Sequence, residues 1–163
     1  MAAPEFLVQA TAGWARLYGD SRAVSVGVTY LHFAGLLLAG GAAVAADRTT
    51  LRTYRADAAT RARHLAALGA THGMVIAGLA LMAVSGTLMF LADVETFWDS
   101  RVFWFKAVLI VALLANGLLL RQSEQLAASR PERGWARLRT TSIVSGVLWF
   151  VLVLVSTVLS VSA

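Results

Sequence analysis

The chain of 163 residues contains no cysteine, only two prolines and a single lysine, Lys106. The absence of cysteine excludes disulfide frameworks, thiolate metal sites and thiol redox chemistry. Charged residues are also scarce, at 14% of the chain, whereas 58% of the residues are apolar. Few water-soluble proteins need so much apolar sequence, so this composition indicates a protein embedded in a lipid bilayer.

Four apolar runs are each long enough to cross the roughly 30 Å hydrocarbon core of a bilayer as an α-helix. They cover residues 23–46, 65–92, 102–120 and 140–163. Backbone polar groups in lipid must be satisfied within each segment, and the connections are short. We therefore expect an all-α integral membrane four-helix bundle with antiparallel neighbours. The length leaves no room for a separate extramembrane domain, so residues 1–163 are predicted to form a single membrane domain.

The first segment, residues 4–20, is amphipathic rather than uniformly apolar. Phe6, Trp14 and Leu17 recur near helical spacing, and Glu5 and Arg16 lie between them. This pattern predicts an interfacial helix that lies in the headgroup layer, with a frayed tail as the alternative. The segment lacks the basic leader and the cleavage site of a signal peptide, so we expect it to remain in the mature protein.

Arginine is distributed unevenly between the connecting segments. Segments 47–64 and 121–139 contain ten arginines, against four basic residues on the opposite side of the expected bundle. The positive-inside rule places these two segments in cytoplasmic loops of a bacterial inner-membrane protein, and both termini on the periplasmic or extracellular side. We interpret the net charge of +5 as a topology signal that also favours contact with membrane lipids, and not as nucleic-acid binding.

Small residues at helical spacing predict close contacts between the helices, because in lipid they allow two backbones to approach. On one face of the first run Gly35, Ala39 and Ala43 follow His32, and the next two runs contain Gly78, Gly86 and Gly117.

Few polar side chains lie inside the apolar runs, and each is a functional candidate because burying it in lipid costs free energy. They are His32, His72, Lys106 and Asn116. At about 1.5 Å per residue, His32 and His72 differ in depth by about 12 Å, whereas His32 and Lys106 differ by about 7 to 8 Å. A lysine stem can cover the smaller gap, so an imidazole and a neutral amine at one level can ligate a haem iron.

Each of these residues also fits a structural interpretation. Lys106 lies near the expected interface and can extend its ammonium to water and headgroups, while His32 can donate a hydrogen bond to a carbonyl or a serine. His72 is a candidate second ligand, proton relay or partner of the arginines. Asn116 is expected to connect two helices by hydrogen bonding. His64 is expected to lie in the loop or at its margin, where histidines are usually solvated.

Outside the runs, an acidic loop contains Asp93, Glu95 and Asp99. Three carboxylates can bind a divalent cation, although exposed acids are more often simply solvated. The apolar runs contain no paired carboxylates, no nucleophile beside a base and no glycine-rich phosphate loop, so hydrolase and nucleotide-driven mechanisms lack their residues.

Two segments carry a family resemblance: YLHFAGLLLAGGAAVAADR at residues 30–48 and DSRVFWFKAVLIVALLANGLLL at residues 99–120. The chain resembles a superfamily of bacterial four-helix membrane proteins that includes the HemJ-type protoporphyrinogen oxidases and the membrane domain of CopD-type copper resistance proteins. It is most similar to the small uncharacterised members. The shared features are a histidine early in the first helix, an arginine at its inner end and aromatic residues leading to a lysine in the third.

The resemblance implies a b-type haem protein of electron transfer or haem-related redox chemistry. In the HemJ type the first-helix histidine and third-helix lysine are regarded as haem ligands. These positions are His32 and Lys106 here, with His72 as substitute ligand and a quinone or a redox protein as partner. A haem-dependent oxidoreductase activity is compatible with this interpretation.

The chain also departs from both relatives. It lacks the tryptophan after the first-helix histidine and the third-helix histidine of the HemJ type, which argues against protoporphyrinogen oxidation. It also lacks methionine clusters that would favour Cu(I). The alternative function is therefore a cofactor-free membrane protein that binds or transports a small solute or a metal such as copper, or an accessory subunit. A homo-oligomer is compatible with either function.

Overall fold

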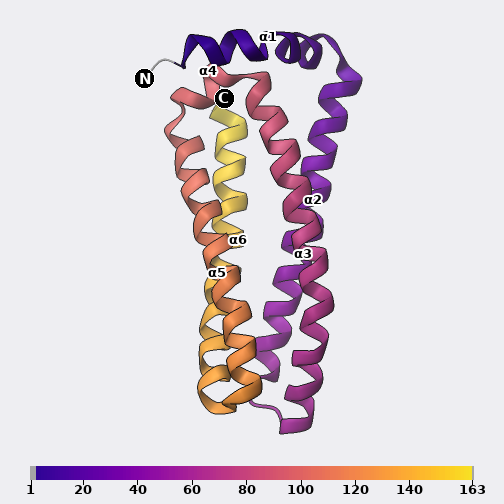
Figure 1. The fold of residues 1–163 in the computed structure, drawn as a ribbon, viewed down its shortest axis with the longest axis vertical. Helices are drawn as coiled ribbons and strands as arrows, with labels where there is room; N and C mark the ends of the chain where they lie inside the picture. The colour runs from indigo at the N-terminus through magenta and orange to yellow at the C-terminus, as the bar shows by residue number, and fades with distance from the viewer. Residues whose placement is uncertain (1–2, 163) are drawn as a thin grey trace.

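The computed structural model describes residues 3–162, and all of its regular structure in that range is helical. The helices are α1 (Glu5–Asp20), α2 (Arg22–Thr53), α3 (Ala58–Ala92), α4 (Val94–Asp99), α5 (Arg101–Ser129) and α6 (Pro131–Ser162). Figure 1 shows α2, α3, α5 and α6 side by side, with α1 lying across one end of them. This end is named the α1 end, and the opposite end, where α2 connects to α3 and α5 to α6, is named the turn end.

The prediction of an all-α chain with four helices of membrane-spanning length is confirmed. Helices α2, α3, α5 and α6 are each long and apolar enough to cross a membrane. Their chain order alternates direction, so that α1, α4 and the last turns of α6 lie at the same end (Figure 1).

The long helices extend beyond the apolar runs at the turn end. Helix α2 continues to Thr53 and α5 to Ser129, so the prediction of loops at 47–64 and 121–139 is wrong. The actual connections are residues 54–57 and Arg130. Falling hydropathy marks where the apolar surface ends, but backbone hydrogen bonding continues until a helix-breaking signal is reached.

Local sequence signals explain where the helices begin. The Asp57 carboxylate accepts a hydrogen bond of 2.9 Å from the backbone N–H of Thr60 and caps α3. Ser21 and Ser100 cap α2 and α5 in the same way. Pro131 is the first residue of α6, a position where its missing N–H has no intrahelical partner to lose.

Glycine allows close contact within the two tightest helix pairs, α2/α3 and α5/α6. A Cβ on Gly78 would lie 2.6 Å from the backbone N of Ala39, and a Cβ on Gly35 would lie 2.8 Å from the Gly78 carbonyl oxygen. A Cβ on Gly134 would overlap the backbone of Ala127. The predicted small-residue contacts therefore occur between α2 and α3, where the backbones touch.

The two pairs are joined mainly through α2 and α6, whereas α3 and α5 touch at few points. The central apolar cluster contains Ala39 from α2, Leu113 from α5, and Trp149 and Leu152 from α6. A Cβ on Gly40 would lie 3.2 Å from Cε3 of Trp149, so the glycine makes room for the indole. The α3/α5 side is therefore the less closely packed side of the structure.

A second cluster closes the turn end around Trp135. The Arg61 guanidinium lies over the Trp135 ring, 5.1 Å from its centroid, and donates to the Tyr54 carbonyl. His64 belongs to α3, and its Nε2 lies 2.8 Å from Oγ1 of the buried Thr50. The prediction of a solvated loop histidine is therefore wrong, because α3 begins six residues before this position.

At the α1 end, Trp14 Nε1 donates a hydrogen bond of 2.7 Å to the Leu88 carbonyl and attaches α1 to α3. The predicted acidic loop is instead the short helix α4, which Asp93 caps by accepting a bond of 3.2 Å from the Thr96 N–H. Two of the three acids thus lie within a helix, and the third has a capping role.

Candidate functional site

Polar side chains come together at two places in the structure. The first, near the α1 end, joins His32 of α2 to Ser85 of α3. The second, nearer the turn end, gathers ionisable residues from α2, α3 and α5 around a cavity.

His32 has a defined hydrogen-bond partner near the α1 end. Its Nδ1 lies 3.0 Å from Oγ of Ser85, and the Ser85 hydroxyl itself donates to the Leu81 carbonyl at 2.6 Å. Because a serine hydroxyl has one hydrogen, Ser85 accepts from His32, and the neutral imidazole carries its proton on Nδ1. Gly86 makes room for the ring, since a Cβ there would lie 3.2 Å from Cε1 of His32. The Nε2 lone pair is consequently left for another partner.

Lys106 is half-buried on α5 and lies within electrostatic range of His32. In residues 3–162 its ammonium forms no hydrogen bond or ion pair. The structure thus brings these two predicted ligands into the same region. The cavity described below is lined by neither of them.

His72 does not share this region. It lies 13 residues before Ser85 on α3, which corresponds to roughly 20 Å along the helix rather than the 12 Å expected from the apolar runs. The Gly78–Ala39 contact sets the register of α2 against α3 and places His72 nearer the turn end. His72 therefore faces α5 and lines the cavity nearer the turn end, and it does not contact the surroundings of His32.

The second place is a cavity of about 230 Å³, lined by residues of α2, α3, α5 and α6. Asp47 projects into it from α2 and is only 6% exposed. Its carboxylate lies beside the hydroxyls of Ser142 and Ser145 on α6. In the described part of the chain, its Oδ2 and the Ser142 Oγ nevertheless make no hydrogen bond. An acid this deeply buried and incompletely satisfied is costly, and such groups mark functional sites.

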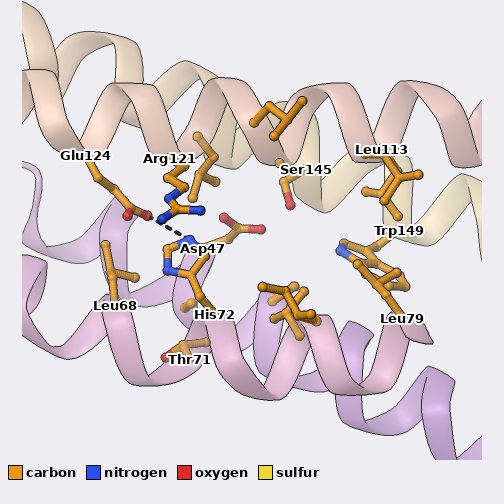
Figure 2. A pocket seen from close by; sticks show the side chains of 18 residues that line it. Asp47, Leu68, Thr71, His72, Leu79, Leu113, Arg121, Glu124, Ser145 and Trp149 are labelled. Atoms are coloured by element: carbon orange, nitrogen blue, oxygen red, sulfur yellow. Dashed lines mark ion pairs between the residues drawn. The ribbon is translucent and has the colours of Figure 1, made fainter. Parts of the chain in front are cut away.

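Glu124 and His72 form an ion pair across the cavity. His72 Nε2 lies 3.5 Å from Glu124 Oε1, and the Glu124 side chain is 15% exposed. Arg121 and Asp47 are both within electrostatic range of Glu124. Figure 2 shows the side chains of these four residues directed toward one another from three helices. We name Asp47, His72, Arg121 and Glu124 the polar end of the cavity.

The opposite end of the cavity is apolar, with Leu79, Leu113 and Trp149 (Figure 2). Its flank between α3 and α5 includes the exposed side chains of Ile76 and Leu118. Because α3 and α5 pack loosely against each other, the cavity opens on this side of the molecule.

Gly117 and Asn116 show how the α5 faces differ. Gly117 lines the cavity and has no heavy atom within 4 Å of a Cβ placed there, so it makes no close helix contact, contrary to the prediction. Asn116 lies on the buried face and donates a hydrogen bond of 3.1 Å to the Thr141 carbonyl of α6. The expected connection between two helices is therefore present.

Sequence reasoning missed Asp47 and Glu124, because both were assigned to loops, and it excluded paired carboxylates on the same grounds. A signal was present in the spacing, since Leu113, Gly117, Leu120 and Glu124 follow one another at intervals of four, three and four residues. This spacing places Glu124 on the face of α5 that lines the cavity.

The donor set at the polar end is suited to charge and hydrogen-bond recognition. Among the residues that the structure describes, no three His, Cys, Asp or Glu side chains lie close enough to hold a metal ion. Comparisons of the chain with protein-family models, with curated proteins and with solved structures find no match.

Proposed function

We propose that the chain is a multi-pass protein of the bacterial inner membrane, with its long helices forming a four-helix bundle and α1 lying in the interface. The apolar helices α2, α3, α5 and α6 support this proposal, as do the exposed Phe6 and Leu17 on α1. The bias of arginines toward the turn end supports a cytoplasmic location for that end and an outside location for both termini.

The absence of cysteine makes this topology simple to test. Single cysteines are introduced by Asp20→Cys near the α1 end and Arg55→Cys at the turn end, both at exposed positions. A membrane-impermeant maleimide should label position 20 in intact spheroplasts and position 55 only after lysis. The reverse pattern would refute the orientation.

We propose that the function of the protein is to bind a small solute in the cavity between α3 and α5, as a membrane transporter or binding protein. The observation that carries this proposal is the Asp47 carboxylate, which is buried and incompletely hydrogen-bonded at the wall of a 230 Å³ cavity. Polar groups that converge at one end of an otherwise apolar cavity are characteristic of small-molecule sites.

A cavity-filling substitution tests this function without removing any polar group. Gly117→Leu places a side chain in the cavity, and Gly41→Leu is the matched control, because Gly41 is exposed on α2 and has open space around it. Small molecules are screened for those that raise the unfolding midpoint of the purified protein, since a ligand at 100 times its Kd stabilises by about 2.7 kcal/mol.

We expect the stabilisation to be lost in Gly117→Leu and kept in Gly41→Leu. Ligands that stabilise both variants equally would bind elsewhere, and the cavity would then not be the functional site.

A second candidate function, binding of haem b for electron transfer, is supported by the orientation of His32. A histidine that ligates a metal donates its other ring N–H to a fixed acceptor, as His32 does to Ser85. His32 and Lys106 would hold the group, which would supply one-electron chemistry with a quinone or a redox protein as partner. The imidazole and the unpaired amine fit as donors, although the cavity lies elsewhere.

An absorption spectrum decides this second candidate. A haem protein purified from haem-replete cells shows a Soret band that is lost in His32→Ala and retained in His64→Ala, whose side chain bonds to Thr50 instead. Colourless wild-type protein would reject haem binding and leave the solute-binding function unaffected.

A further inference from the structure

The charges at the polar end of the cavity are unequally buried. Helix α2 contributes Asp47, α3 contributes His72, and α5 contributes Arg121 and Glu124, whereas α6 contributes only hydroxyl groups. Two carboxylates face one guanidinium, and the imidazole of His72 lies 3.5 Å from Glu124. The carboxylates are the buried groups, at 6% exposure for Asp47 and 15% for the Glu124 side chain, whereas Arg121 is exposed. The most deeply buried charged groups at the polar end are therefore the two acids.

A buried negative charge needs a compensating positive charge or a proton. Arg121 compensates one carboxylate at most, and no ion pair within 4.0 Å joins it to either acid in the described structure. Within residues 3–162, Asp47 retains an unpartnered oxygen and forms no ion pair with a guanidinium or an ammonium group. The buried Asp47 carboxylate therefore needs a proton, or a cation that enters the cavity from outside.

The rest of the cavity indicates the size and polarity of that cation. Leu79, Leu113 and Trp149 form an apolar end opposite the acids (Figure 2). A volume of about 230 Å³ is below the 300–1,000 Å³ or so of sites for drug-sized ligands. The cavity therefore suits one ring or a short alkyl group attached to a single charged group.

The access route also favours an amphiphilic ligand. Ile76 of α3, and Leu114 and Leu118 of α5, are apolar, exposed and part of the cavity wall. In the proposed bundle these side chains face lipid, so a ligand arrives between α3 and α5 from the bilayer. A hydrated inorganic ion does not partition into that phase.

Given the proposed solute-binding function, we propose that the ligand is a monovalent amphiphilic ammonium compound that binds with its charge between Asp47 and Glu124 and its apolar part against Trp149. The ammonium replaces a proton on the Asp47 carboxyl group, and this proton leaves to the solvent, so the charge of the site is unchanged. The ammonium belongs either to a free organic amine or to the headgroup of an ethanolamine lipid.

The test uses three probes of similar size and different charge: benzyltrimethylammonium, benzyl alcohol and phenylacetate. Binding to the full-length protein in dodecyl maltoside is measured by calorimetry in two buffers of different ionisation enthalpy, which reports proton release. We expect benzyltrimethylammonium to bind at least about tenfold more tightly than either other probe, because only the cation compensates the buried charge. Its binding should release about one proton and weaken as the pH falls, because protons compete for the carboxylates.

Two variants locate the charge that binds the probe. Asp47→Asn preserves side-chain shape and should weaken benzyltrimethylammonium binding at least about tenfold and abolish proton release. Glu132→Gln removes an exposed acid in the first turn of α6 and should change neither. If Asp47→Asn does not fold, Gly117→Leu keeps every ionisable group and should still exclude the probe.

The outcomes separate this inference from the function on which it rests. Preferential binding of phenylacetate or benzyl alcohol that Gly117→Leu abolishes would overturn the inference and preserve the solute site. Binding of the cation that Asp47→Asn and Gly117→Leu leave unchanged would overturn both, and so would failure of all three probes. Competition by added ethanolamine lipid, but not by glycerol lipid, would show that the ammonium group belongs to a lipid headgroup. If ethanolamine lipid does not compete, the ammonium group belongs to a free amine.

Discussion

Replacing Gly78 by alanine tests the contact that determines the register of α2 against α3. An ideal Cβ at this position lies 2.6 Å from the Ala39 backbone N, and 2.8 Å from both the Ala39 Cβ and the Gly35 carbonyl oxygen. Favourable contact between such atoms requires about 3.5 to 4.0 Å. Because these neighbours belong to the backbone or lie next to it, the helices must separate by about 1 Å to accept the methyl group.

The expected magnitude follows from comparison with overpacked cores, in which an inserted methyl group costs about 1 to 3 kcal/mol. Alanine has the higher helix propensity, by up to about 1 kcal/mol, and this opposes the loss. We therefore expect Gly78→Ala to lower the free energy of unfolding by about 1 to 2 kcal/mol. Gly73→Ala is the matched control on the same helix, where a Cβ meets nothing within 4 Å, and should not destabilise the protein.

The assay is reversible unfolding by sodium dodecyl sulfate in mixed micelles, followed by circular dichroism. Gly35→Ala should behave like Gly78→Ala, and the double variant should lose less than the sum, because the first substitution already separates the helices. Equal stability of Gly78→Ala and its control Gly73→Ala would show that α2 and α3 do not meet at this point. Full additivity of Gly35→Ala and Gly78→Ala would show the same.

Three further predictions concern the helix contacts and caps. Gly134→Ala should destabilise at least as much as Gly78→Ala in the same unfolding assay, because its Cβ would overlap the Ala127 backbone; unchanged stability would contradict the tight α5/α6 connection. Asn116→Leu should cost about 1 kcal/mol by removing the hydrogen bond to α6, and no loss would mean that the bond does not contribute. The Thr60 backbone N–H holds the pKa of the Asp57 carboxyl below its usual range, so the cap stabilises fully above the unfolded pKa of about 3.9 and is lost as the pH falls through the folded value. Stability measured against pH should therefore decline less steeply below about pH 4 in Asp57→Asn, and identical profiles would refute the charged cap.

The four long helices could be predicted from the sequence, because transfer of apolar side chains into lipid is a local property of each run. Their ends could not, since hydropathy does not report backbone hydrogen bonding, and α2 and α5 continue by seven and nine residues to Thr53 and Ser129 beyond the runs that end at 46 and 120. Those additional turns carry Asp47 and Glu124, so the error in the boundaries hid the carboxylates of the cavity.

The candidate site residues also divide into those whose contacts could be predicted from the sequence and those whose contacts could not. The alternative that His32 donates a hydrogen bond to a carbonyl or a serine could be stated from the sequence, but which of the two it contacts could not, and the structure gives Ser85. The depth of His72 depended on the register of two helices, which the contact between Gly78 and Ala39 determines in three dimensions. Haem ligation by His32 and Lys106 remains a prediction.

The unequal packing of the four long helices has a mechanical consequence. Helices α2 and α3 form one closely packed pair, and α5 and α6 form another. The two pairs are joined mainly by the contact of α2 with α6. The two helix pairs can separate between α3 and α5 by a hinge motion about the α2/α6 contact, without breaking any backbone hydrogen bond. Widening the gap between α3 and α5 to admit a ligand therefore disturbs only a few contacts between these helices, and each helix pair can move as a unit.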